Sequence, residues 1–468
     1  MPASPASESP SASTAVTFDW PLCSEAEQLL RRQIDRFLAV HPFAAQLAER
    51  LRDETGNDFF EWVDHFTLAP AQVPALRAAR LVEEAVEAPA DATVFWHPRA
   101  MLPRVIVQAG GDRDGAPVEL AIRVEVLADF LSAHDSDAPI AGRFGARLRR
   151  AAISQHHGRS LGAVERLGYR GFVVREPTAE FVSGVLQARE LWRTRKRDFA
   201  DDAQGVAHAF ARLDAVRQLV DRDAACELFF AAEREYWESR NRAAQIQKRR
   251  QDRLGLGWGN HDHHTFRNSR AHFADLMVFL EKLGFHKRER YYAGAEAGWG
   301  AQISEQPVAG IVTFADVDLM PDETAIDFST QRMPRAPEMR TVGLWCGLHG
   351  DSFLQAGMHH LEARFDFARL RDQLAQQGVT TMKPFSDFEF LRQAFTEGER
   401  WSVRPGRVAV LRQAGLISAA QAEGFVRDGA IGSHLENLQR KGGFKGFNQK
   451  SVSVIIAATD PRKIQAAH

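Results

Sequence analysis

The sequence predicts an α+β protein in which βαβββ modules form a cupped sheet, preceded by a largely helical N-terminal half. Three observations lead to this prediction. Strand-like and helix-like runs follow the order strand, helix, strand, strand, strand over residues 61–125 and again over 263–314. A further strand and helix at 358–377 begin the same order once more. Residues from about 180 to 250 are instead rich in Ala, Arg, Glu and Leu with few breakers, so long amphipathic helices are expected there.

The N-terminal region is expected to span residues 21–255. The Ser, Ala and Pro-rich start lacks the basic end and apolar core of a signal peptide, and residues 1–20 are expected to be a disordered tail. Leu30, Ile34 and Phe37 recur at helical spacing, which predicts helix from about Ser24 to Leu51. The strand at 62–66, the helix at 74–85 and the strands at 93–96, 104–108 and 119–124 are interpreted as a degenerate, structural module.

The C-terminal region is expected to span residues 256–468, after a glycine-rich stop at 254–257. It opens with a strand at 263–267 and a helix from about 269 to 283, which Gly284 ends. Strands are expected at 288–292, 300–304 and 310–314, and the strand at 358–365 precedes a helix at 367–377. Two such modules side by side would form a cup whose inward side chains can bind one metal ion.

Composition excludes several classes of protein. Lys plus Arg (59) nearly balances Asp plus Glu (61), so a nucleic-acid partner is not expected. No apolar run approaches the roughly 18 residues of a membrane span. Three scattered cysteines form neither a disulfide framework nor a CxxC site, which favours a cytoplasmic protein. The oligomeric state cannot be read from the sequence.

A histidine cluster is the most specific feature of the chain. Residues 260–267 read Asn-His-Asp-His-His-Thr-Phe-Arg. Strand alternation places His261 and His263 on one face and His264 on the other. Arg267 follows His263 on the same face, about 13 Å further along the strand. A metal-binding imidazole and a guanidinium at this spacing suit a substrate with an anionic far end, whereas a surface or structural role is the alternative.

A second histidine pair, His359 and His360, opens the next strand–helix run at the position that His263 takes in the first. The two side chains point to opposite faces, so only one is expected to bind the metal.

The carboxylate ligand is expected on a later strand. Residues 395–401 read Phe-Thr-Glu-Gly-Glu-Arg-Trp, which leaves Glu397 and Glu399 as alternatives, and Glu362 is their rival. Two histidines and one carboxylate leave up to three positions open on the metal, and the absence of thiolate favours Fe(II) or Mn(II).

Residues 262–267 resemble the Asp-His-x-x-Phe-Arg strand of the 2-oxoadipate dioxygenase/decarboxylase (hydroxyglutarate synthase) family, which has a vicinal-oxygen-chelate fold. The resemblance implies that His263 is a metal ligand and that Arg267 binds a substrate carboxylate. Residues 359–364 resemble the Asn-His-Leu-Thr-Pro-Arg segment of the family, which implies that His360 is the second ligand. About 250 residues precede the first motif here, unlike in the family, and Asn at 359 and Thr-Pro at 362–363 are not reproduced.

Two shorter matches complete the resemblance. Residues 395–400 resemble the Phe-Gly-Glu-Ile-Glu-Gln-Arg segment of the family, which points to Glu397 as the carboxylate ligand. Val452 and Ser453 match a Val-Ser pair that contacts substrate in the family.

The function expected from this resemblance is that of a non-haem Fe(II) dioxygenase that decarboxylates and hydroxylates a dicarboxylic 2-oxo acid, of the 2-oxoadipate to 2-hydroxyglutarate type. Its partners would then be the 2-oxo acid and dioxygen. The alternatives are a metal-dependent isomerase, lyase or ring-cleaving dioxygenase on the same scaffold, and a binding protein without metal chemistry.

Overall fold

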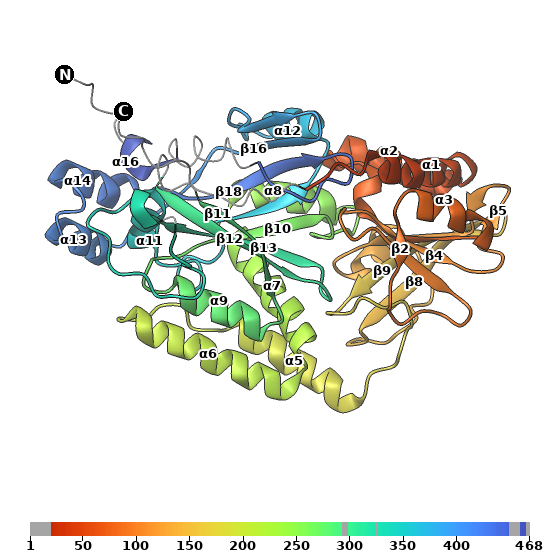
Figure 1. The fold of residues 1–468 in the computed structure, drawn as a ribbon, viewed down its shortest axis with the longest axis horizontal. Coiled ribbons are helices and arrows are strands. Elements are labelled where there is room, and N and C mark those ends of the chain that lie inside the picture. The colour runs from red at the N-terminus through yellow and green to blue at the C-terminus, as the bar shows by residue number, and fades with distance from the viewer. Residues whose placement is uncertain (1–19, 293–297, 324, 449–458, 465–468) are drawn as a thin grey trace, which may run out of the picture.

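The computed structural model describes residues 20–292, 298–323, 325–448 and 459–464, and it has two mixed sheets with helices around them (Figure 1). The predicted α+β class with βαβββ modules is confirmed. The tail expected over residues 1–20 lies, except for Trp20, outside the described residues.

The N-terminal half contains a seven-stranded sheet in the order β2-β3-β4-β1-β7-β9-β8. Its strands are β1 (Val63–Leu68), β2 (Val82–Glu83), β3 (Thr93–Trp96), β4 (Arg104–Val107), β7 (Glu119–Arg123), β8 (Leu148–His156) and β9 (Arg159–Arg166), and β5 (Asp112–Arg113) pairs with β6 (Ala116–Pro117) beside it. Helices α1 (Ser24–Val40), α2 (Pro42–Arg50), α3 (Val73–Ala78) and α4 (Leu127–Ala133) bury the apolar face of this sheet in one core.

The helix expected from Ser24 to Leu51 is split in the structure. Pro42 disfavours helical geometry at the residue before it, and His41 is extended, so α1 ends at Val40 and α2 begins at Pro42. His41 then caps α2 by accepting a hydrogen bond from the Ala44 N–H on its ring nitrogen.

The C-terminal half contains a nine-stranded sheet in the order β11-β12-β13-β10-β14-β18-β16-β15, with β17 paired to β18. Its strands are β10 (His261–Arg267), β11 (His286–Tyr292), β12 (Trp299–Gln306), β13 (Ile311–Asp318), β14 (His360–Arg364), β15 (Ser386–Phe388), β16 (Leu391–Phe395), β17 (Glu399–Trp401) and β18 (Ala430–Arg440). The strands and helices predicted between residues 263 and 377 are all present, with shifted ends.

The two sheets share one topology. Strand β1 pairs in parallel with β4 and antiparallel with β7, as β10 does with β13 and β14. Each first strand also has a β-bulge at the same place, between Val63 and His65 in β1 and between His261 and His263 in β10.

Long helices cover the outer face of the C-terminal sheet, as expected for residues 180–250. They are α5 (Ala179–Arg193), α6 (Asp202–Leu219), α7 (Arg222–Glu238) and α8 (Arg242–Asp252), and α9 (Phe273–Lys282) packs among them below the sheet in Figure 1. Thr178, Asp201, Asp221 and Asn241 cap the first four, each accepting a backbone N–H of the first turn. This packing leaves the opposite face of the sheet to form the cup.

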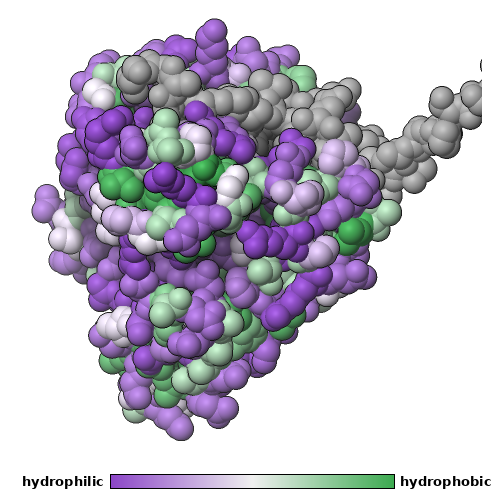
Figure 2. Space-filling model, turned by 90° about the vertical axis from the view of Figure 1, so that its left-hand side faces the viewer, coloured by the Kyte–Doolittle hydropathy of each residue, from purple (hydrophilic) through white to green (hydrophobic). Residues whose placement is uncertain are grey.

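Shorter helices close the other end of the molecule. Helix α11 (Thr341–His349) packs against α13 (Pro405–Gln413) and α14 (Ala419–Asp428) in a separate apolar cluster, while α12 (Phe367–Gln376) and α16 (Pro461–Ile464) lie near the upper edge (Figure 1). Hydrophilic side chains predominate on this end, with apolar ones in small groups (Figure 2). Among the described residues, no helix has the length and apolar character needed to span a membrane.

Candidate metal centre

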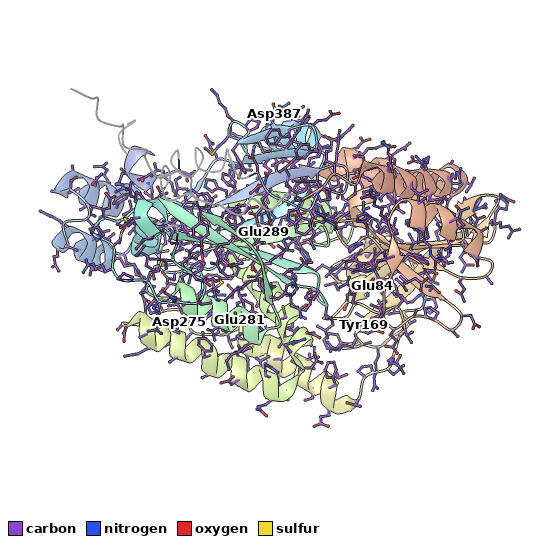
Figure 3. All side chains as sticks on the ribbon, viewed as in Figure 1. Glu84, Tyr169, Asp275, Glu281, Glu289 and Asp387 are labelled. Atoms are coloured by element: carbon purple, nitrogen blue, oxygen red, sulfur yellow. The ribbon has the colours of Figure 1, made fainter. Side chains whose placement is uncertain are left out.

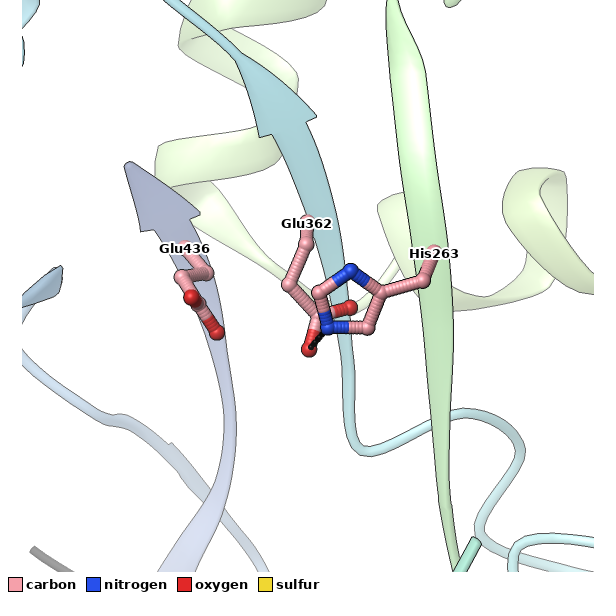
Figure 4. A group of neighbouring side chains, drawn as sticks. All are labelled: His263, Glu362 and Glu436. Atoms are coloured by element: carbon pink, nitrogen blue, oxygen red, sulfur yellow. Dashed lines mark ion pairs between the residues drawn. The ribbon is translucent and has the colours of Figure 1, made fainter. Parts of the chain in front are cut away.

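Three adjacent strands bring three ionisable side chains to one point of the cup (Figure 4). His263 on β10 lies opposite Glu362 on β14, and Glu362 lies beside Glu436 on β18. One nitrogen or oxygen atom from each of the three side chains lies within 4.8 Å of the others, and all three residues are buried. Buried carboxylates and imidazoles converge in this way at metal sites.

His360 adds a fourth donor because it precedes Glu362 by two residues and shares its face of β14. Its Nε2 atom lies 2.6 Å from Glu362 Oε1 and 3.5 Å from Glu436 Oε2, while His263 Nε2 lies 2.8 Å from the same Glu362 oxygen.

These distances fit a divalent cation. Two ligands about 2.1 Å from one octahedral metal ion lie about 3 Å apart, close to the separations of the four donors. Glu362 Oε2 is also buried without a hydrogen-bond partner among the described residues. The donor set is two imidazoles and two carboxylates without a thiolate, which suits Fe(II) or Mn(II).

The charges of the group depend on one another. Burial raises the pKa of Glu362, but His263 and His360 outweigh it and lower that pKa to about 2. Burial lowers the pKa of His360, but Glu362 and Glu436 raise it to about 9. Burial and the neighbouring Glu362 both raise the pKa of Glu436. Protons on the imidazoles thus balance the carboxylates, and a bound cation would take their place.

Two neighbouring side chains orient the carboxylates. Thr265 Oγ1 donates a 2.6 Å hydrogen bond to Glu362 Oε1, and Gln393 Nε2 donates a 2.8 Å hydrogen bond to Glu436 Oε1. Both are buried. Glu436 is held at Oε1 and directs Oε2 at His360, whereas Glu362 accepts from Thr265 on the same Oε1 that faces both imidazoles.

The centre opens into a small cavity of about 40 Å³. Its walls include Phe314, Phe385, Phe395, Phe447 and Asn448. Arg267 also lines this cavity, on the same face of β10 as His263, with its Nε 3.4 Å from Asp316 Oδ2. Asp316 is the only carboxylate that forms an ion pair with this guanidinium among the described residues, so the remaining nitrogens of Arg267 can receive an anion.

His261 does not share the face of His263, contrary to the prediction from strand alternation. The bulge at Asp262 turns His261 to the helix side, where its ring centroid lies 5.4 Å from that of His264. His264 contacts Arg234 and Phe230 on that side.

Of the residues predicted for the site, the structure brings His263, His360 and Arg267 together. Glu397 lies apart from them: it follows β16, its side chain is exposed, and its N–H bonds to Thr380 O. Glu399 is also outside the centre, where its carboxylate accepts the Arg242 N–H.

Other predictions had different outcomes. Val452 and Ser453 lie outside the described residues. Glu362, the internal rival, is central to the group. Glu436 was not singled out from the sequence, although it stands between Leu435 and Leu438 in a long strand, where a lone carboxylate is unusual.

Comparisons with known proteins do not identify a family for this chain. No family model and no curated protein matches the chain. The chain is similar to a triple mutant of 4-hydroxymandelate synthase from Streptomyces coelicolor, with 14% identity, a TM-score of 0.29 and coverage of 86% of this chain and 99% of that one. It is also similar to methylmalonyl-CoA epimerase from Mycobacterium tuberculosis, with 12% identity, a TM-score of 0.21 and coverage of 39% and 88%.

A third similar structure is the uncharacterized protein YdcJ from Shigella flexneri, which includes domain DUF1338, with 13% identity, a TM-score of 0.24 and coverage of 54% and 73%. At these TM-scores the likenesses carry no weight for the function, which has to come from the residues of the site.

Proposed function

We propose that the chain is a non-haem iron oxygenase that acts on a 2-oxo acid. The observation that supports this proposal is the convergence of His263, His360 and Glu436 in a buried cup without a thiolate. Two histidines and one carboxylate leave three adjacent positions free, enough for a chelating 2-oxo acid and dioxygen together. Bound Fe(II) would supply the redox chemistry of oxygen activation and decarboxylation.

The protein's own residues would bind and orient the substrate. Arg267 would hold a second, distal carboxylate, which favours dicarboxylic 2-oxo acids such as 2-oxoadipate. The phenylalanine walls of the cavity would exclude water from the reacting carbons. Thr265 and Gln393 would keep the two carboxylates of the centre in place through their hydrogen bonds.

Metal analysis coupled to oxygen uptake tests this proposal. Anaerobically purified protein, supplied with Fe(II) and 2-oxoadipate, is expected to bind one iron per chain and consume oxygen with release of carbon dioxide. His263→Ala is expected to lose both properties. Iron binding without uptake would rule out 2-oxoadipate, and the absence of stoichiometric metal would rule out the centre.

The role of Arg267 has a separate test. Arg267→Met is expected to raise the KM for 2-oxoadipate much more than that for a monocarboxylic 2-oxo acid of similar size. The exposed Arg400→Met is the control. Equal effects on the two substrates would contradict a contact between Arg267 and the distal carboxylate.

A second candidate function is a metal-dependent isomerase or lyase. The second carboxylate supports it, because Glu362 and Glu436 both face the centre, so one can bind the cation while the other accepts a substrate proton. Such an enzyme would exchange a substrate proton with solvent and consume no oxygen. Deuterium incorporation without oxygen uptake would favour this alternative.

A further inference from the structure

A buried arginine holds the aspartate that contacts His263. His263 Nδ1 lies 2.9 Å from Asp262 Oδ1. Arg440, at the end of β18, donates to the same carboxylate from Nε and NH2, each at 3.0 Å. Its third nitrogen, NH1, donates to Gly446 O at 2.6 Å. One guanidinium thereby joins β10, β18 and the loop that follows β18.

That loop carries Phe447 against the imidazole. The two ring centroids lie 4.6 Å apart with the rings nearly perpendicular. Arg440 also lies 5.3 Å from the centroid of Phe447. The ring of His263 is therefore fixed at one nitrogen by Asp262 and on one side by Phe447, which leaves Nε2 directed at Glu362.

The N-terminal half repeats this arrangement. His65 Nδ1 lies 2.7 Å from Asp64 Oδ2, and Arg166, at the end of β9, donates two 2.8 Å hydrogen bonds to Asp64. Arg166 NH1 donates to Gly171 O at 2.8 Å and to the carbonyl of Tyr169, which lies beside the N-terminal sheet (Figure 3). The Phe172 ring packs 4.9 Å from the His65 ring.

The carboxylates are what the N-terminal copy lacks. Ala121 lies opposite His65, and Gly162 lies beside Ala121. These positions correspond in strand order and register to Glu362 and Glu436. The single group of potential metal ligands among the described residues is the C-terminal one. The arginine–aspartate–histidine arrangement therefore persists where the two facing carboxylates are replaced by Ala121 and Gly162, and the two copies differ in the residues that face the imidazole.

We propose that Arg440 is a positioning residue of the metal centre, while Arg166 has only a structural role. Through Asp262, Arg440 sets the tautomer and the plane of His263, so that the unprotonated Nε2 faces the cation. This inference rests on the proposed metal centre. Partners of this kind, which hold a ligating histidine without touching the metal, typically change metal affinity about 10- to 100-fold.

Cobalt titration of the metal-free protein tests the proposal, because Co(II) absorption reports both affinity and coordination geometry. Arg440→Met is expected to bind Co(II) about 10- to 100-fold more weakly and with an altered spectrum. Arg166→Met, the matched control, is expected to lose a similar amount of thermal stability yet keep the affinity and spectrum of the wild type. Arg440→Lys keeps the positive charge but loses the planar guanidinium that donates to Asp262 and Gly446 at once, so its Co(II) affinity is expected to remain below that of the wild type.

The outcomes separate the two proposals. Equal Co(II) affinity of wild type and Arg440→Met would overturn the role of Arg440 alone, and so would an equal loss of affinity in Arg166→Met. No Co(II) binding by the wild type would overturn the metal centre and with it this role. If Arg440→Met does not fold, Asp262→Asn replaces it as the variant and Asp64→Asn as the matched control. Asp262→Asn is then expected to weaken Co(II) binding and Asp64→Asn is not, and equal Co(II) affinity of the two variants would contradict the proposal.

Discussion

At the scale of single residues, the two carboxylates of the metal centre differ in how much protein already holds them. Glu362 Oε1 contacts Thr265, His263 and His360, whereas Glu436 is hydrogen bonded by Gln393 and lies further from His360. Three protein ligands leave room for a bidentate substrate and oxygen, but four would not. Because Thr265 already hydrogen bonds to the Glu362 oxygen that faces both imidazoles, we propose that Glu436 is the carboxylate ligand, and we expect Glu362 to be dispensable for metal binding.

Conservative substitutions of three glutamates test this assignment. Glu436→Gln is expected to weaken iron binding by more than about 100-fold, because loss of a ligand exceeds the effect of losing an outer partner. Glu362→Gln is expected to retain iron with reduced affinity, and the exposed Glu397→Gln to bind it as the wild type does. Equilibrium dialysis with metal analysis measures the iron affinity of the three variants. Loss of iron in Glu397→Gln would instead support the ligand expected from the sequence.

His349 provides a residue-scale prediction on pH. It is buried at the end of α11 with its Nε2 3.1 Å from Ile431 O, and burial lowers its pKa to about 3. The unfolded chain, in which histidine titrates near pH 6.5, binds the extra proton between these values. The stability contributed by neutral His349 is thus present above pH 6.5 and is lost as the pH falls.

His349→Gln is expected to flatten this dependence. The slope of the free energy of unfolding against pH below 6.5 should fall by up to about 1.4 kcal/mol per pH unit. Urea denaturation at several pH values measures the slope. A variant whose slope equals that of the wild type would contradict the prediction.

At the scale of elements, helix α7 is tied to the chain around it by a buried carboxylate. Glu233 is fully buried and accepts hydrogen bonds from Arg195 and Arg197, at 2.8 and 2.7 Å. The two arginines also donate to the carbonyls of Phe353 and Leu354. This cluster joins α7 to the segment that leads into β14, the strand of His360 and Glu362.

Glu233→Gln would leave the buried guanidinium of Arg195 and the partly buried guanidinium of Arg197 without a counter-charge. The free energy of unfolding is expected to fall by about 3 kcal/mol. Glu235→Gln on the same helix is a matched control, because its pair with Arg193 is exposed, and exposed pairs contribute about 0–1 kcal/mol. Urea denaturation compares the two variants. Equal losses would mean that burial of the cluster does not determine its contribution.

At the scale of the whole molecule, a polar network joins the two halves. Asn260, just before β10, donates from Nδ2 to Asn57 Oδ1 at 3.0 Å and to Arg364 O at 2.9 Å. Gln251 on α8 donates to Asn260 Oδ1 at 3.2 Å. At another point of contact, Trp20 donates to Glu289 on β11, which is labelled in Figure 3. We infer that the halves depend on each other for stability.

Asn260→Ala tests that dependence. It leaves the buried Asn57 oxygen without this donor, which costs about 1–3 kcal/mol. The protection of backbone amide hydrogens against exchange is expected to decrease to the same extent in β1 and in β10. Hydrogen exchange measures both. Gln204→Ala, at an exposed position, is the control. A decrease confined to one half would contradict the inferred coupling.

Local patterns in the sequence predicted much of the metal centre. Spacing and element order singled out the two histidine clusters, and the resemblance to a known family selected His263, Arg267 and His360 within them. The βαβββ order likewise depends on local hydrophobic periodicity. These features involve residues within a few positions of one another.

The remaining features depend on contacts between distant segments. Glu436 joins the centre because β18 pairs with β14 in a register that places it beside Glu362, 74 positions earlier in the numbering of the chain. Glu397 lies outside because β16 ends at Phe395, opposite Glu436, and the chain then turns away. The bulge at Asp262 separates His261 from His263. The sequence by itself determined which short segments carry the clustered histidines, and only the tertiary structure decided which carboxylate faces them, because strand register is set by long-range pairing.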